Sequence, residues 1–235
     1  MNILALDSTA EVASVAVCSD DKPLAVYTVK NGNTHSQTLL PMIEAALLHA
    51  GLTIDDIELF AASEGPGSFT GVRIGAATLK GLAFGRGLPC VGVSTLEALA
   101  HNLIGFEGII CPVMNARRSQ VYNAIFIGDG CSVKRLTPDR ALAISELEDE
   151  LDQMKSESIY LVGDGYDVTK KGFSRSEIAA TPRLLRNQNA YSVAICALRQ
   201  YENGNYKSDS LVTATYLRLS QAERERLEKE KNIII

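Results

Sequence analysis

Two short segments carry residues that could bind a nucleotide or another phosphate-bearing anion. The first ends the N-terminal apolar run and consists of Asp7, Ser8 and Thr9. The second follows an apolar run in the middle of the chain and supplies Asn115, Arg117 and Arg118. A carboxylate at such a turn can hold a magnesium-bound water, and hydroxyl, guanidinium and backbone N–H groups can meet phosphate oxygens. For the first segment, an ordinary polar turn that bonds its own backbone explains the residues equally well.

A third segment, Gly65–Gly75 (GPGSFTGVRIG), predicts a strand end, a tight turn and the start of a helix. Gly67 and Ser68 would place free N–H groups and a capping hydroxyl at the helix start, where anions bind. The segment lacks the Gly-Lys-Ser/Thr of a P-loop and the glycine spacing of a dinucleotide fold. A tight turn followed by a closely packed helix is therefore the favoured interpretation, with phosphate binding as the alternative.

Residues for metal-dependent or nucleophilic catalysis are missing from the sequence. Its three histidines, His35, His49 and His101, form no pair at helical metal-binding spacing, and Ser68 is not in a Gly-x-Ser-x-Gly context. The five cysteines are scattered, odd in number and without metal-finger spacing. We expect no catalytic residue, no metal site, and free thiols in a reducing cytoplasm.

Composition narrows the classes of partner. The 235 residues carry a net charge of −5 and are 46% hydrophobic and 22% charged, as in a globular protein. An acidic chain has no long-range attraction for nucleic acid, so any service to RNA should pass through another protein. No apolar run reaches the ~18 residues of a membrane span, and the N-terminus reads as a strand and not as a signal peptide.

The order of predicted elements is repeated. Strands at 2–7, 12–18 and 24–30 precede a helix at 36–52, a strand at 57–63, a helix at 70–84, a strand at 89–93 and a short helix at 95–102. A similar order restarts near residue 105, with strands at 109–114, 120–127 and 132–136. Duplicated β-β-β-α-β-α-β-α units predict the two-lobed actin-like ATPase (ribonuclease H-like) α/β fold. The predicted division is an N-terminal lobe 1–104, a C-terminal lobe 105–218 and a charged helical tail 219–235.

Two helices of the first lobe carry more apolar or glycine surface than a sheet needs. Apolar residues occupy over half of the circumference of the helix at 36–52. Each interior glycine of the helix at 70–84 costs about 1 kcal/mol, which close approach of another backbone must offset. The additional apolar face of these helices could be covered by another part of this chain or by a partner protein, and we favour a partner. The predicted contact residues are Leu39, Leu40, Ile43, Leu47, Gly71, Val72, Gly75, Thr78, Leu79 and Leu82.

Several segments resemble the TsaB/YeaZ family: Gly65–Gly75, Ile3–Thr9 (ILALDST), His35–Ile43 (HSQTLLPMI), Val91–Ala100 (VGVSTLEALA) and Asn115–Tyr122 (NARRSQVY). The resemblance implies a non-catalytic scaffold for TsaD, the enzyme that transfers threonylcarbamoyl to adenosine in tRNA. It also implies binding of a TsaD homologue through the first lobe, association with a TsaE homologue, a homodimer when alone, and only indirect contact with tRNA. The family often has aspartate where this chain has Asn115, which removes a carboxylate.

The same resemblance explains the expected lack of activity. TsaD-type proteins place two metal-binding histidines after the fifth strand, at positions that here are Thr95 and Leu99. Leucine cannot bind a metal and neutral threonine is a poor ligand. We expect no cofactor to be required by the chain itself, with ATP or ADP conceivable at the complex interface. An ATP-binding enzyme of the actin-like superfamily and a glycoprotease-like peptidase are the alternatives. Charged residues at Gly75 or Ile43 are expected to abolish pairing without unfolding the chain.

Overall fold

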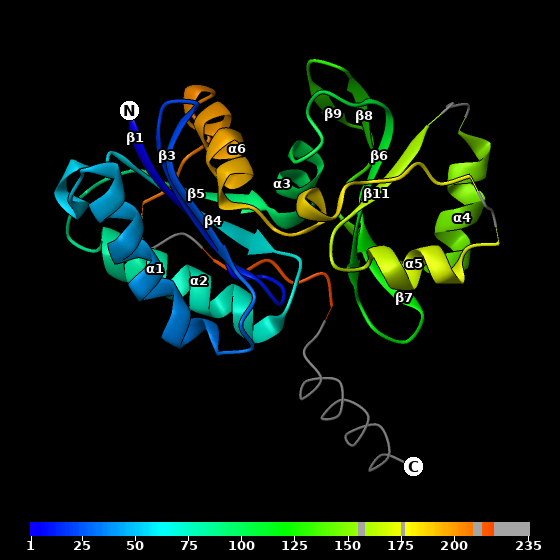
Figure 1. The fold of residues 1–235 in the computed structure, drawn as a ribbon, viewed down its shortest axis with the longest axis horizontal. Helices are drawn as coiled ribbons and strands as arrows, with labels where there is room; N and C mark the ends of the chain where they lie inside the picture. The colour runs from blue at the N-terminus through cyan, green and yellow to red at the C-terminus, as the bar shows by residue number, and fades with distance from the viewer. Residues whose placement is uncertain (155–157, 175–176, 209–212, 219–235) are drawn as a thin grey trace, which may run out of the picture.

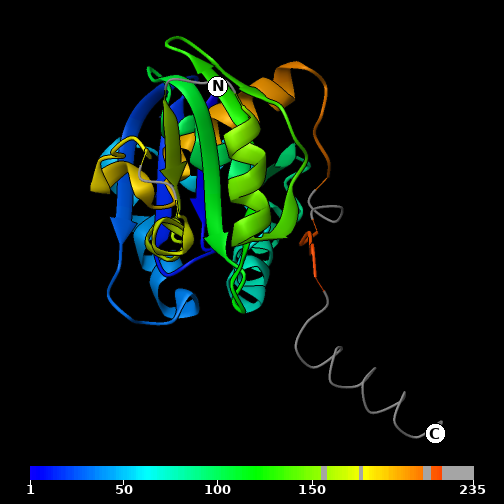
Figure 2. The same cartoon turned by 90° about the vertical axis from the view of Figure 1, so that its right-hand side faces the viewer.

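The computed structural model describes residues 1–154, 158–174, 177–208 and 213–218. Two lobes, each built on its own β-sheet, lie side by side (Figure 1). Turned by 90°, the second lobe stands in front of the first (Figure 2). This is the actin-like α/β fold that the repeated element order predicts.

The sheet of the first lobe has five strands in the order β3-β2-β1-β4-β5. The strands are β1 (Asn2–Asp7), β2 (Ala13–Ser19), β3 (Lys22–Val29), β4 (Leu59–Gly65) and β5 (Cys90–Ser94). β1, β2 and β3 form an antiparallel meander, and β1, β4 and β5 are parallel. The carboxyl ends of β1 and β4 therefore meet at one edge, which brings the Asp7 turn beside the Gly65 turn.

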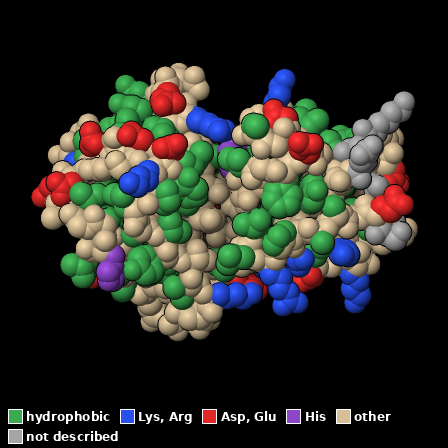
Figure 3. Space-filling view, turned by 45° about the horizontal axis from the view of Figure 1, so that its top comes forward, with side chains coloured by type: hydrophobic (Ala, Val, Ile, Leu, Met, Phe, Trp, Pro, Cys, Tyr) green, Lys and Arg blue, Asp and Glu red, His purple; other side chains and the backbone are tan. Residues whose placement is uncertain are grey.

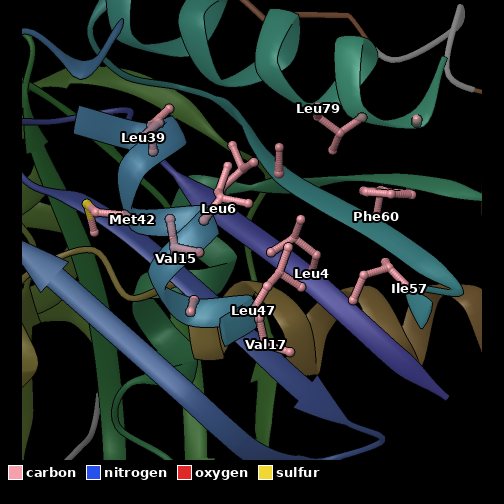
Figure 4. Close-up of a cluster of buried hydrophobic side chains, with 14 of the residues drawn as sticks. Leu4, Leu6, Val15, Val17, Leu39, Met42, Leu47, Ile57, Phe60 and Leu79 are labelled. Atoms are coloured by element: carbon pink, nitrogen blue, oxygen red, sulfur yellow. The ribbon is translucent and has the colours of Figure 1, made fainter. Parts of the chain in front are cut away.

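Strands β1, β2 and β4 are buried on both faces of the sheet, whereas the edge strand β3 is largely exposed. Successive side chains of a strand point to opposite faces. Leu4 and Leu6 of β1 pack with the helices of one face, whereas Ile3 and Ala5 pack on the other. Figure 4 shows the first face, where side chains from β1 and β2 meet Leu39, Met42, Leu47 and Leu79 of the two covering helices. Near-continuous apolar strands are thus a consequence of two-sided burial.

The two covering helices are α1 (His35–Ala50) and α2 (Phe69–Ala83). Helix α1 ends at Gly51, whose φ of 69° permits the left-handed C-cap that satisfies the carbonyls of Leu47 and Leu48. Helix α2 begins after Ser68, whose hydroxyl accepts the Gly71 N–H group. A single turn of 3-10 helix (Ile54–Asp56) links α1 to β4.

The second lobe is also built on a mixed β-sheet, which has six strands instead of five. Its strands are β6 (Glu107–Asn115), β7 (Gln120–Asn123), β8 (Phe126–Asp129), β9 (Val133–Arg135), β10 (Arg140–Ala143) and β11 (Ile159–Val162). β7 and β8 pair antiparallel with successive halves of β6, and β11 pairs parallel with β6. Helices α4 (Ile144–Gln153) and α5 (Tyr166–Gly172) pack with one face of this sheet. A short 3-10 helix (Arg183–Arg186) follows.

Two helices pack on the sheet formed by the other half of the chain. Helix α3 (Thr95–His101) packs on the second sheet through Leu96, Leu99 and Ala100. Helix α6 (Ala190–Glu202) returns to the first sheet through Val193 and Ala197. Residue order alone does not decide which sheet an apolar helix covers. The predicted tail 219–235 lies outside the described residues. Among the residues that are described, no helix is long and apolar enough to cross a membrane.

Burial on α1 and α2 predicts a contrast between two leucines. Leu79 lies on the sheet-facing side of α2 and is fully buried. Leu79→Ala should therefore lower the free energy of unfolding by about 2–5 kcal/mol, because the truncated side chain leaves a cavity. Leu48 is 74% exposed, so Leu48→Ala should change it by less than about 0.5 kcal/mol. Urea denaturation of both variants measures the difference; equal losses would contradict this placement of the helices.

Candidate interlobe site and helix-docking surface

The side chains of the first predicted anion-binding turn are turned inward. Asp7 is fully buried and accepts hydrogen bonds from the Thr9 N–H group (2.8 Å), the Thr9 hydroxyl (2.7 Å) and the Ser63 hydroxyl. Burial raises the pKa of the Asp7 carboxyl, and these three donors oppose that rise. The Ser8 hydroxyl donates to the Gly71 carbonyl at 2.8 Å. These contacts match the alternative interpretation, in which the polar side chains of the turn form hydrogen bonds within the chain itself.

Gly71 and Gly75 of α2 are needed because this turn lies against the helix. A Cβ atom at Gly71 would stand 2.0 Å from the Ser8 carbonyl oxygen, and one at Gly75 would stand 2.7 Å from the Ser8 hydroxyl oxygen. At Gly67 the Thr9 carbonyl oxygen would be 2.4 Å away, and that carbonyl also accepts the Ser68 N–H group. The predicted close approach is present, but the approaching backbone belongs to this chain and not to a partner.

A cavity of about 530 Å³ lies between the lobes. Thr9, Gly67 and Ser68 line it from the first lobe, and Asn115 and Arg117 line it from the second. The structure therefore brings these five predicted residues together. Asp7, Ser8 and Arg118 are not among its lining residues.

The second anion-binding segment forms the hairpin turn between β6 and β7. Arg117, Arg118 and Ser119 have φ values of 62°, 54° and 56°, and the Gln120 N–H group bonds the Arg117 carbonyl. Positive φ at the two central residues is the backbone of a hairpin turn that follows the twist of its strands. Asn115 accepts the Arg117 N–H group at 2.8 Å, so its carboxamide supports the turn.

Asp164, in the Gly163-Asp164-Gly165 turn before α5, also lines the cavity. Its side chain is open to water within the cleft, yet protein atoms surround it on most sides. This burial raises the pKa of Asp164 to about 6, and the nearby carboxylates of Glu11 and Asp7 add to the rise. No site residue was predicted here from sequence; the Gly-Asp-Gly pattern after a strand was the available signal.

Actin-like folds imply a nucleotide in this cleft, and the residues present do not fit a triphosphate. The Asp7 carboxylate already accepts three donors, and the Ser8 hydroxyl and Ser68 N–H groups are bonded within the chain. Glu11 and Asp164 line the cavity together with Arg117 and Arg218, so its wall carries both signs of charge and only part of it would attract phosphate oxygens.

Thr95 and Leu99, the positions expected to match the metal-binding histidines of TsaD-type proteins, are both buried, at the start of α3 and within it. Leu99 packs into the core of the second lobe, and the Thr95 hydroxyl has no hydrogen-bond partner in the described part of the chain. Among the described residues, no group of three or more His, Cys, Asp or Glu side chains is placed to hold a metal ion.

Seven of the ten predicted partner-contact residues are buried in the chain's own first lobe: Leu39, Ile43, Leu47, Gly71, Val72, Gly75 and Leu79. The prediction that these side chains form a contact surface is corrected, because they face the sheet and the β1–β2 turn. A charge at Ile43 or Gly75 would disrupt this core, which also corrects the expected outcome of such substitutions. Leu40 is 50% exposed, and Thr78 and Leu82 are partly exposed.

The remaining apolar surface forms a groove of about 510 Å³ between α1 and the end of α2. Leu40 and Leu48 line it from α1, and Leu82 and Phe84 line it from α2. Leu48 and Phe84 are 74% and 80% exposed. Sequence reasoning missed Phe84 as a contact residue, although a phenylalanine just before Gly85-Arg86-Gly87 at a helix end was a usable signal.

Fold and site together define a class: a two-lobed actin-like protein whose interlobe turns are bonded within the chain and whose first lobe exposes an apolar groove. The family of TsaD, the tRNA N6-adenosine threonylcarbamoyltransferase, matches residues 29–226. TsaB of Escherichia coli is 35% identical over 71% of this chain and 72% of its own length. The chain belongs to the TsaB/YeaZ family.

Two further matches support membership of the TsaB/YeaZ family, and a third protein is similar in fold alone. TsaB of Bacillus subtilis is 27% identical over 98% of this chain and 100% of its own length. YeaZ from Pseudomonas aeruginosa superposes with a TM-score of 0.80 at 25% identity, covering 92% of this chain and 99% of that one. The ethanolamine utilization protein EutJ from Carboxydothermus hydrogenoformans, at 13% identity and a TM-score of 0.51, shares the fold.

The raised pKa of Asp164 predicts a pH dependence of stability. The folded chain binds this proton more tightly than the unfolded chain, so the contribution is complete at low pH and is lost between about pH 4 and 6. Asp164→Asn should therefore stabilise the protein relative to wild type more at pH 7 than at pH 4. Thermal denaturation at both pH values measures this.

Asp129 supplies a control of opposite sign. N–H groups of Cys131 and Ser132 lower the pKa of Asp129, so its contribution to stability is present at pH 7 and lost as the pH falls below about 4. Asp129→Asn should cost stability mainly at pH 7. An Asp164→Asn variant whose difference from wild type does not change with pH would contradict the prediction.

Proposed function

We propose that this chain is a non-catalytic subunit in the biosynthesis of tRNA threonylcarbamoyladenosine, where it docks onto a TsaD homologue through the α1–α2 groove. The proposal rests on Leu48 and Phe84, the two most exposed of the large hydrophobic side chains described in the first lobe, where Leu40 is also half exposed. Membership of the TsaB/YeaZ family supplies the class of partner.

The groove has the chemistry of a protein interface. Its floor is apolar, and Glu44 and Arg86 stand among its lining residues. Arg86 is held by an ion pair with Asp55 and by a 2.9 Å bond from its Nε atom to the Leu82 carbonyl. An apolar centre with a charged rim is typical of specific interfaces, which bury about 1,200–2,000 Å² in total. The whole exposed faces of α1 and α2 would be needed to supply that area.

The proposed lack of catalysis is based on residues that are buried inside the two lobes. Thr95 and Leu99 are buried and cannot act as a metal-binding pair, and the Asp7 turn is occupied by its own chain. The chain itself is therefore proposed to require no nucleotide; ATP or ADP could lie at the boundary with the partner. An ATP-dependent enzyme or a peptidase finds no support in these contacts.

Contact with tRNA is proposed to be indirect. The net charge is −5, which gives no long-range attraction to a phosphate backbone; on the face in Figure 3 acidic side chains lie mostly in the upper half and basic ones gather along the lower right edge. A TsaE homologue is proposed to join the complex, and a homodimer through the same groove to form when the chain is alone. None of the five cysteines, all of which lie in the described part of the chain, is in a disulfide, which supports a reducing cytoplasm as the compartment.

Introducing negative charges into the apolar groove tests the docking proposal. Leu48→Asp with Phe84→Asp should abolish co-elution with the TsaD homologue of the same organism, because buried unpaired charges oppose association. The melting temperature should stay within about 2 °C, since both side chains are exposed. Leu184→Asp is the matched control: Leu184 is 88% exposed but lies in the second lobe, and should leave the complex intact. Undiminished co-elution of the groove variant would overturn the proposal.

Isothermal titration calorimetry of the isolated chain with magnesium and ATP tests the nucleotide proposal. We expect no saturable heat at ATP concentrations up to the millimolar range, where a Kd of 1 mM corresponds to about −4.1 kcal/mol. Saturable binding accompanied by turnover would instead establish an ATP-dependent enzyme.

A further inference from the structure

Residues 213–218, which we call the strap, run from the first lobe to the second and form the orange-red stretch between the lobes in Figure 1. On the first lobe, the Thr215 N–H group donates to the Glu64 carbonyl at 2.7 Å. A Cβ atom at Gly65 would stand 2.4 Å from the Thr215 carbonyl oxygen, so the two backbones are in direct contact. The strap is therefore seated on the end of β4.

Tyr216 anchors the strap to α2. Its ring stacks on Phe69 with centroids 4.4 Å apart, and its hydroxyl accepts a 2.9 Å hydrogen bond from Arg73 Nε. The Arg73 guanidinium lies 3.9 Å from the centroid of the Phe69 ring. Aromatic stacking and a cation over a ring each add to the energy of simple burial.

Arg218 anchors the other end to the second lobe. Its guanidinium donates to the Ala116 carbonyl at 2.9 Å and to the side-chain oxygen of Gln120. Both acceptors lie at the base of the β6–β7 turn. Two residues that are two positions apart thus hold opposite walls of the cleft, each through directional contacts.

We propose that the strap is a latch that fixes the separation of the lobes on the side of the cleft away from α3 and α6. The lobes meet at α3 and α6, where the Asn102 side chain accepts the Ser192 hydroxyl at 2.7 Å and Arg199 contacts His101 at 2.9 Å. A contact on one side leaves two lobes free to open as a hinge; the strap restrains the other side. Its contacts are non-covalent and Tyr216 is 40% exposed, so the latch can be released. This inference concerns the chain's own motion and goes beyond the docking function.

The distance between a spin label on each lobe tests the latch in the full-length chain. Cys131, in the β8–β9 turn, is exposed, and the other four cysteines are buried, so it provides the label in the second lobe. Gln37→Cys on the exposed side of α1 provides the other. Electron–electron double resonance should give one narrow distance distribution for this parent protein. Tyr216→Ala with Arg218→Ala should increase the population outside that distribution about tenfold, equivalent to ~1.4 kcal/mol.

Two further variants make the result specific. Tyr216→Phe keeps the ring stack and loses only the bond from Arg73, so its effect should be smaller than that of Tyr216→Ala. Tyr206→Ala removes another exposed tyrosine from the same C-terminal stretch, one that contacts Tyr201 and not α2, and should leave the distribution unchanged. Circular dichroism confirms folding; if the double variant fails to fold, Arg218→Gln alone is measured. An unchanged distribution in a folded variant of Tyr216 or Arg218, or equal broadening by Tyr206→Ala, would overturn the latch.

Discussion

The packing of the β1–β2 turn against the N-terminal half of α2 is the contact on which the rest of the structure depends. The Ser8 carbonyl oxygen lies where a Cβ atom at position 71 would be, only 2.0 Å away, so no other residue fits without moving the backbone. This approach fixes the direction of α2 over the sheet. The same helix carries Phe69 and Arg73 near its start, where they contact the strap, and it ends at the apolar groove beside Phe84. One turn thereby positions both surfaces.

Much of the fold follows from sequence patterns, because they are local. Apolar or β-rich runs in the first three strands and the restart of the element order near residue 105 predict a duplicated meander, and both sheets are present. The exchange of α3 and α6 between the lobes is not predictable in this way. Val193 and Ala197 show that α6 has a buried face, but the identity of the sheet beneath it depends on contacts distant in sequence.

The candidate site was harder to predict, since apolar character does not tell a core face from a docking face. On α1, Leu39 and Leu40 are adjacent and chemically identical, yet the first is 1% exposed and the second 50%. Glycine spacing on α2 correctly indicates a close backbone neighbour, but Ser8 is separated from Gly71 by 63 positions. Burial is a property of the assembled lobe, and only the rotation of each helix about its axis distinguishes the two faces.

The cleft illustrates how a two-lobed fold can keep its shape while its polar groups turn inward. Ser8 and Ser68 carry donors that an anion would need, Asp7 carries a carboxylate that a magnesium-bound water would need, and each is bonded to another part of the same lobe. A ligand could recruit them only by breaking buried hydrogen bonds, and leaving a buried donor or acceptor unpaired costs about 1–3 kcal/mol each. That cost would recur for every group recruited, so affinity for phosphate would fall with each contact. Leu48 and Phe84 incur no such cost, because exposed apolar surface gains on burial against a partner. The physical balance therefore favours association over ligand chemistry.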